Sequence, residues 1–186
     1  MFQRLFGRER TRNRQIVVAL YSEIVAAARR ELFFSDWEVP DTPLGRYEMV
    51  SLHMFLMQRR LRGEKGAAAD LAQALIDEFF LEVDHSLREL GIGDVGVPKR
   101  MKKLARMFYG RTSSYGAALD AGNREELTAA LARNIRPETA SWRHASALAA
   151  YVMSAAEALS HQPAAEICAG KVVFPPPEAD KEEPGP

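Results

Sequence analysis

The stretch from Gly91 to Arg111, GIGDVGVPKRMKKLARMFYGR, decides how the chain is expected to fold. Its first part is a loop whose glycines make accessible the backbone angles that other residues avoid. Pro98 then suits the first turn of a helix, because the N–H that proline lacks has no helical partner there. We therefore predict a helix that starts near Pro98, preceded by a structural loop motif made of Gly91, Gly93, Asp94 and Gly96.

The helix predicted after Pro98 has two different faces. Met101, Leu104 and Phe108 recur at three- and four-residue spacing, which is typical of a stripe buried against a core. No acidic residue lies between Asp94 and Asp120. At about 100° per residue, most of the cations of this helix point away from the apolar stripe. We predict that these cations and two residues near the end of the segment bind a partner: Lys99, Arg100, Lys102, Lys103, Arg106, Tyr109 and Arg111.

Composition indicates one globular domain with a substantial core, since 47% of the 186 residues are hydrophobic and 27% are charged. The formal net charge is zero, so the overall charge selects no partner. The charges are segregated, with a basic segment at 1–14, an acidic segment at 64–94 and an acidic end at 178–183. The single cysteine, Cys168, rules out an intramolecular disulfide and argues against a zinc cluster.

Hydrophobic periodicity predicts an all-α domain of six or seven packed helices within residues 15–161. The expected helices cover 15–34, a span ending near residue 61, 67–90, a span starting at 98, 123–134 and 139–159. Residues 1–14 form a separate basic segment in this division. Residues 162–186 form a flexible tail, because proline-rich and acidic sequence does not build a core.

The segment before the second predicted helix is a structured connector. Asp41 or Thr42 is expected to cap that helix, with Arg46 and Glu48 holding the connector in place. His53 lies in a strongly apolar stretch, where a buried histidine bonded to a neighbouring helix or to the connector is favoured over a ligand role. The connector motif also includes Pro40 and Gly45.

No set of residues with catalytic spacing emerges from the sequence. Glu82 and His85 form one Glu-x-x-His pair, but di-iron bundles use that pair twice, and a second copy is missing. There is no Gly-x-Ser-x-Gly, and the glycine loop follows a predicted helix where a dinucleotide fingerprint follows a strand. We therefore predict a non-enzymatic protein with no metal and no cofactor.

Two alternatives for the cations stay open at this stage. The predicted Lys99–Arg111 helix can bind RNA through phosphate contacts, or it can be a solvated face paired with acids such as Asp77, Asp84 and Glu89. Residues 1–14 carry Phe2, Leu5 and Phe6 among five arginines, which suits an anionic membrane surface as well as a loose terminus. The most apolar run, 16–28, is interrupted by Ser22 and Glu23 and is shorter than the roughly 20 residues that span a bilayer. We expect a cytoplasmic protein or one bound peripherally to the inner membrane.

Three blocks of sequence resemble the ubiquinol–cytochrome c chaperone family: residues 40–56, 74–111 and 115–119. Within the second block, the pattern GxGDxGVPKRxKK followed by FYGR is uncommon among helical proteins. The resemblance extends over about residues 16–158 and, with no transit-type extension, suggests a bacterial member. It implies an assembly chaperone that binds cytochrome b, or another subunit, during biogenesis of the cytochrome bc1 complex of the respiratory chain. Mitochondrial members work near the ribosomal exit, which leaves ribosome contact open for this chain.

Overall fold

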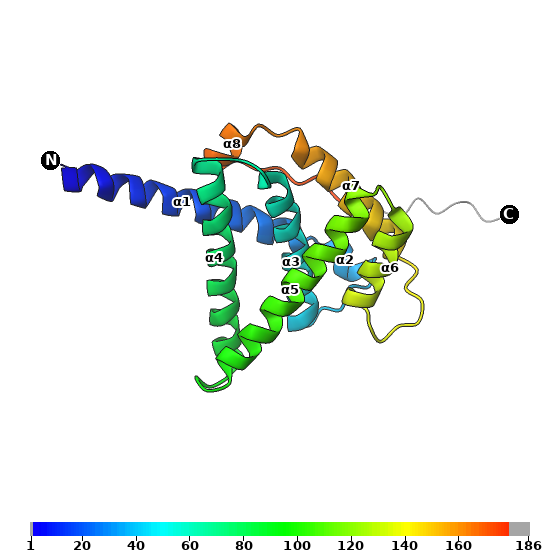
Figure 1. The fold of residues 1–186 in the computed structure, drawn as a ribbon. Helices are drawn as coiled ribbons and strands as arrows, with labels where there is room; N and C mark the ends of the chain where they lie inside the picture. Colours follow the sequence, from blue (N-terminus) through cyan, green and yellow to red (C-terminus); the bar gives the residue numbers. More distant parts are fainter. Residues whose placement is uncertain (1, 179–186) are drawn as a thin grey trace.

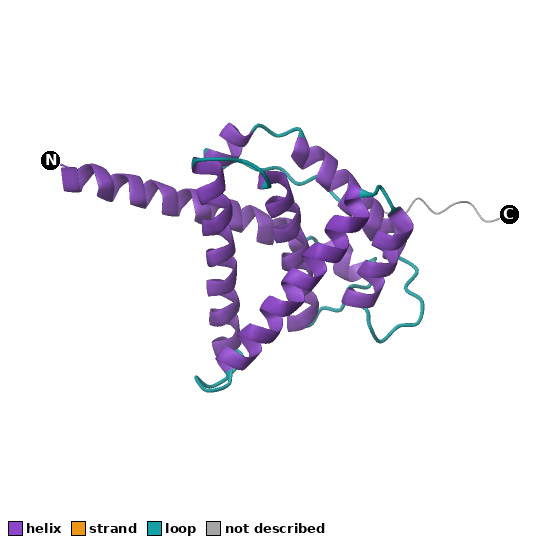
Figure 2. Ribbon diagram, in the orientation of Figure 1, coloured by secondary structure: helices purple, strands orange, loops and turns teal. Residues whose placement is uncertain are grey.

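The computed structural model of the chain describes residues 2–178, with side chains described from residue 11 onward. This part of the chain contains eight helices and no strand, so the predicted all-α class is confirmed (Figures 1 and 2). Among these helices, none has the length and apolar character that crossing a bilayer requires. The helices are α1 (Phe2–Ala28), α2 (Glu31–Ser35), α3 (Pro43–Leu61), α4 (Ala67–Glu89), α5 (Val97–Asp120), α6 (Arg124–Ile135), α7 (Ala145–Ser160) and α8 (Ala164–Cys168).

Helix α3 is the centre of the bundle. It packs against α1, α4, α5, α6 and α7, and most of its residues are buried. A helix that is apolar on nearly every side has to be enclosed by others, which explains this position. Helices α4 and α5 diverge from the loop that joins them, so the two form a V beside α3 (Figure 1).

Several helix ends differ from the predicted ones. The first helix starts at Phe2, and its N-terminal turns extend away from the other helices (Figure 1). The chain then breaks at Arg29 and Arg30, so that α2 is separate from α1. Helix α5 continues through Gly110 and Gly116, although glycine is unfavourable within a helix. Helix α7 starts at Ala145 because the turn before it is anchored by Trp142, whose indole N–H donates to the Trp37 carbonyl at 2.8 Å.

The predicted domain boundary at residue 161 needs a correction. Helix α8 buries Ile167, and the following extended segment buries Val172 and Phe174 in the core. The Arg30 guanidinium donates to the Phe174 carbonyl at 2.8 Å and also to the Pro175 carbonyl, which fixes the segment in place. Three apolar side chains are therefore enough to order residues that composition alone assigned to the flexible tail. Residues 179–186, which include most of the acidic end, lie outside the described residues.

Candidate functional site

The connector motif is built around the start of α3. The Thr42 hydroxyl accepts a hydrogen bond from the Gly45 N–H at 3.1 Å, so Thr42 is the helix cap. Asp41 has a different role, because its carboxylate accepts two bonds from Arg46, at 2.6 and 3.1 Å. Gly45 allows the Pro40 carbonyl to approach closely, since a Cβ at this position would lie 1.9 Å from the Pro40 oxygen.

A buried ion pair joins α3 to α5. The Arg111 guanidinium contacts both carboxylate oxygens of Glu48 at 2.6 Å, and the two side chains are only 15% and 2% exposed. Burial raises the pKa of Glu48 to about 7, although the positive charge of Arg111 opposes that rise. Glu48 therefore does not hold the connector, and Arg111 faces the interior. The assignment of Arg111 to the partner-binding surface is corrected by this contact.

His53 is completely buried and has a partner for each ring nitrogen. Nδ1 lies 2.8 Å from the Met49 carbonyl, to which it donates, and Nε2 lies 2.7 Å from the Tyr151 hydroxyl on α7. Rings of Phe33 and Phe174 pack against the imidazole at 5.8 and 5.3 Å. Burial lowers the pKa of His53 to about 4, so the ring is neutral at physiological pH. The predicted bond to a neighbouring helix is confirmed.

The loop between α4 and α5 closes α4 with a Schellman motif. Gly91 has φ +78°, its N–H donates to the Arg88 carbonyl at 2.9 Å, and the Ile92 N–H donates to Leu87 at 3.2 Å. Gly93 and Gly96 have no positive φ. The prediction that the glycines of this loop adopt backbone angles that other residues avoid is therefore confirmed at Gly91 and wrong at the other two.

The rest of this loop leads directly into α5. The N–H groups of Gly96 and Val97 donate to the Gly93 carbonyl at 2.8 and 3.2 Å, so these two donors are already occupied. Asp94 forms an ion pair with Arg88, and Pro98 lies in the first turn of α5, as predicted.

We call the exposed cations on the first half of α5 the basic face: Lys99, Arg100, Lys102, Lys103 and Arg106. None of them forms an ion pair or side-chain hydrogen bond with any residue that the structure describes. The acids considered as partners are engaged elsewhere or stay apart: Asp84 pairs with Arg88, and Asp77 accepts from Gln73. Tyr109 lies 56% exposed near the end of the face, and Phe108 is buried on the opposite side.

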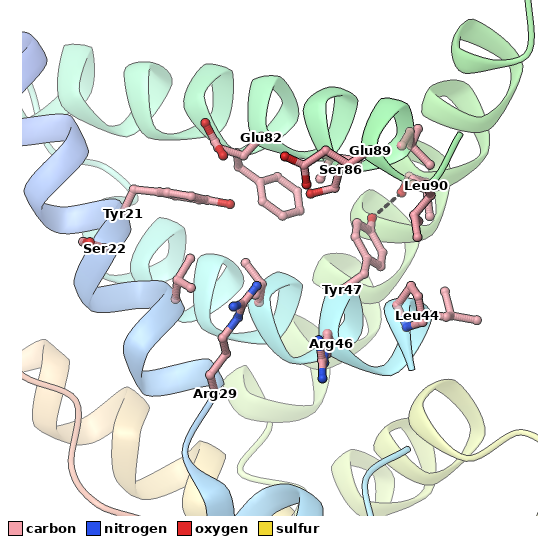
Figure 3. Close-up of a pocket in the computed structure, with 17 residues that line it drawn as sticks. Tyr21, Ser22, Arg29, Leu44, Arg46, Tyr47, Glu82, Ser86, Glu89 and Leu90 are labelled. Atoms are coloured by element: carbon pink, nitrogen blue, oxygen red, sulfur yellow. Dashed lines mark hydrogen bonds between the residues drawn. The ribbon is translucent and has the colours of Figure 1, made fainter. Parts of the chain in front are cut away.

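A second surface feature is a groove between α1, α3 and α4, with a volume of about 610 Å³ (Figure 3). Arg29 and Arg46 lie on the α1 and α3 side, and Glu82 and Glu89 lie on the α4 side. Sequence analysis missed this groove because its lining comes from separate segments of the chain, at residues 21–29, 43–50, 79–90 and 104. Its floor is formed by apolar side chains that include Val25, Val50, Phe79, Val83, Leu87 and Leu104.

The Glu82–His85 pair does not belong to a larger ligand set. The Glu82 carboxylate lies 3.7 Å from His85 Nδ1, and both side chains are about half exposed. Within the described residues, no group of three or more His, Cys, Asp or Glu side chains could hold a metal ion. The pair therefore has the geometry of a solvated contact on the helix surface.

Comparison with known proteins places this geometry in a family. Residues 35–174 match the family described as Ubiquinol-cytochrome C chaperone. The chain belongs to this family. The matched region includes the connector, the Glu48–Arg111 pair, the basic face and the ordered segment up to Phe174. No curated protein matches the chain significantly.

A crystal structure supports the family assignment over nearly the whole chain. It is the structure of the Cbp3 homolog from Brucella abortus, which is 54% identical in sequence and superimposes with a TM-score of 0.88. The similarity covers 97% of this chain and 99% of the other. The resemblance seen in the three sequence blocks is thus confirmed.

Proposed function

We propose that this member of the family is a non-enzymatic assembly chaperone that binds cytochrome b during biogenesis of the cytochrome bc1 complex. The family description and the similarity to the Cbp3 homolog support this proposal. Two buried polar side chains also have structural partners: Glu48 is bound by Arg111, and His53 is held by Tyr151. A protein that acts by binding needs an exposed surface, and we propose the basic face for this role.

The single observation that carries the proposed binding site is the basic face. Its cations are exposed on one helix and lack ion pairs within the part of the chain that the structure describes. A partner with acidic groups can therefore bind without first breaking ion pairs within the chaperone. Tyr109 adds an exposed aromatic ring next to these cations, and such rings are common in binding surfaces.

The proposal includes a second binding surface, which contacts the membrane. Residues 1–14 contain five arginines and the apolar residues Phe2, Leu5 and Phe6, a composition that favours an anionic lipid surface. The side chains up to residue 10 lie outside the described residues. The support for this membrane contact is therefore the composition of the segment and not its geometry. Peripheral binding at the cytoplasmic side of the inner membrane would keep the chaperone near a membrane-embedded client. Ribosome contact stays a prediction from the family resemblance.

Affinity capture with charge-reversal variants tests the proposal. Lys99→Glu with Lys103→Glu changes two positions of the basic face, and Lys65→Glu with Lys171→Glu makes the same charge change at exposed lysines elsewhere. We expect capture of cytochrome b from native membranes to be lost in the first variant and kept in the control. Equal capture by both folded variants would refute the assignment.

The RNA alternative is tested with the same two variants. The unpaired state of the basic face is what a phosphate backbone would require, and binding would then weaken steeply as salt rises. Salt-sensitive binding of a single-stranded RNA oligonucleotide, lost in the Lys99→Glu, Lys103→Glu variant, would favour this alternative if cytochrome b capture stayed normal.

A further inference from the structure

We propose that the groove between α1, α3 and α4 binds an amphipathic α-helix of a protein partner. The apolar face of that helix lies on the groove floor, and its two charged edges lie against the rims. This inference goes beyond the proposed function, because it uses a different surface from the basic face and does not depend on which protein supplies the helix.

The dimensions of the groove fit one face of a helix. Along α4, the lining extends from Phe79 to Leu90, which is about 16 Å at 1.5 Å per residue, or three helical turns. A volume of about 610 Å³ has room for the side chains from one face of a helix but not for a whole helix, which is about 10–12 Å across with its side chains. In such docking, residues at positions i, i+3, i+4 and i+7 serve as anchors.

Two leucines at the groove are left uncovered by the fold. Leu44, in the first turn of α3, is 51% exposed, and Leu90, at the end of α4, is 57% exposed. Figure 3 shows both at the same end of the groove, beside Tyr47. Large exposed apolar side chains next to an apolar groove are typical of interaction sites. A pocket for a small molecule would instead enclose most of its ligand, and these half-exposed leucines leave the groove open.

Opposite charges on the two rims define the chemistry of the partner. Arg29 and Arg46 border the groove on one side, and Glu82 and Glu89 border it on the other (Figure 3). Arg46 is already paired with Asp41, and the Glu82 carboxylate lies 3.7 Å from His85 Nδ1. Arg29 and Glu89 make no ion pair with any residue in the described part of the chain, so each rim keeps one unpaired charge. A helix with acidic residues along one edge and basic residues along the other would meet opposite charges at both rims. A uniformly charged helix would meet like charge at one of them.

Synthetic peptides test this inference directly. The probes are three amphipathic peptides of about 14 residues, or four turns, with identical leucine faces. One peptide has a lysine edge and a glutamate edge, one has two lysine edges, and one has two glutamate edges. We expect the mixed peptide to bind the full chain with a Kd at least tenfold lower than either uniform peptide, measured by fluorescence anisotropy.

Variants locate the binding site and control for folding. Leu44→Glu should weaken binding of the mixed peptide at least tenfold, and the fold tolerates it because an acid suits the first turn of a helix. Leu81→Glu makes the same change on α4 at a 40% exposed residue outside the groove, and should leave binding unchanged. Glu89→Lys should shift the preference toward the peptide with two glutamate edges.

Several results would overturn the inference. Equal affinities for the three peptides would show that the rims do not recognise charge, and equal effects of Leu44→Glu and Leu81→Glu would place the peptide elsewhere. Binding of monomeric dodecylphosphocholine without binding of any peptide would show a site for a small amphiphile. The probes contain no cytochrome b sequence, so their failure would leave the proposed client and the basic face unaffected.

Discussion

The two sides of α5 carry cations in opposite situations. Arg111 lies inside, where Glu48 neutralises it across a 2.6 Å contact, whereas the cations of the basic face lie outside without ion pairs to described residues. The difference follows from helix geometry, because at about 100° per residue Arg111 lies roughly 120° round the helix from Lys99, toward the buried side. Basic residues from one motif can thus stabilise the fold or form a binding surface. Changing them one at a time separates the two roles.

The largest expected effect comes from removing the buried cation. Arg111→Met leaves the Glu48 carboxylate buried without its counter-charge, which should cost about 3–5 kcal/mol of unfolding free energy at pH 8. The cost should shrink toward pH 5. Burial raises the pKa of Glu48 in the folded chain above its value in the unfolded chain. The folded chain is therefore more stable at low pH, where Glu48 is protonated, and it loses that stability as the pH rises through the folded pKa. Urea unfolding at the two pH values measures this.

The matched control for that variant removes both charges. Glu48→Gln combined with Arg111→Met should recover much of the lost stability and abolish the pH dependence, since no uncompensated charge remains in the interior. An Arg111→Met variant as stable at pH 8 as at pH 5 would contradict the account of the buried pair.

A smaller loss of unfolding free energy is expected when the hydrogen bond between the uncharged side chains of Tyr151 and His53 is removed. Tyr151→Phe removes the hydroxyl that donates to His53 Nε2 at 2.7 Å and leaves a fully buried acceptor without a partner. The expected cost is about 1–3 kcal/mol, measured by thermal or chemical unfolding. Tyr109→Phe removes the same group from a residue that is 56% exposed beside the basic face, and it should cost far less. Equal costs would show that the His53 bond contributes nothing specific.

Local patterns in the sequence predicted much of the fold but few of its long-range contacts. The apolar stripes of α3, α4 and α5 depend on residues within a few positions of each other, so they can be predicted from the sequence. The same holds for the Thr42 cap and for the cap of α6, where the Asn123 side chain accepts from the Glu126 N–H at 3.0 Å. The Glu48–Arg111 pair joins residues 63 positions apart, and no local signal announces it. The groove was missed for the same reason. The orientation of Arg111 can nevertheless be predicted from the sequence, because about 100° per residue places Arg111 on the same side of the helix as Leu104 and Phe108.

At the surface of the connector, the cap and the ion pair can be compared directly. Thr42→Ala removes the oxygen that accepts from the Gly45 N–H and should cost about 1 kcal/mol. Asp41→Ala breaks the pair with Arg46, but both side chains are more than half exposed, so the effect should be smaller than that of Thr42→Ala. Differential scanning calorimetry of the two variants gives the order. A larger loss for Asp41→Ala would reverse the roles that the structure gives them.

The smallest effect on stability is expected on the basic face itself. Lys99→Glu with Lys103→Glu alters exposed side chains that have no partner within the described residues, so the unfolding free energy should change by less than about 0.5 kcal/mol. If the face instead paired with acids of α4, reversing two of its charges would destabilise the fold and shift the salt dependence of unfolding. A near-zero change in stability together with lost capture of cytochrome b would show that the outer cations serve binding. Arg111 would then differ from them, because its removal lowers the unfolding free energy. A change in stability comparable to that of Arg111→Met would instead mean that both sides of α5 serve the fold.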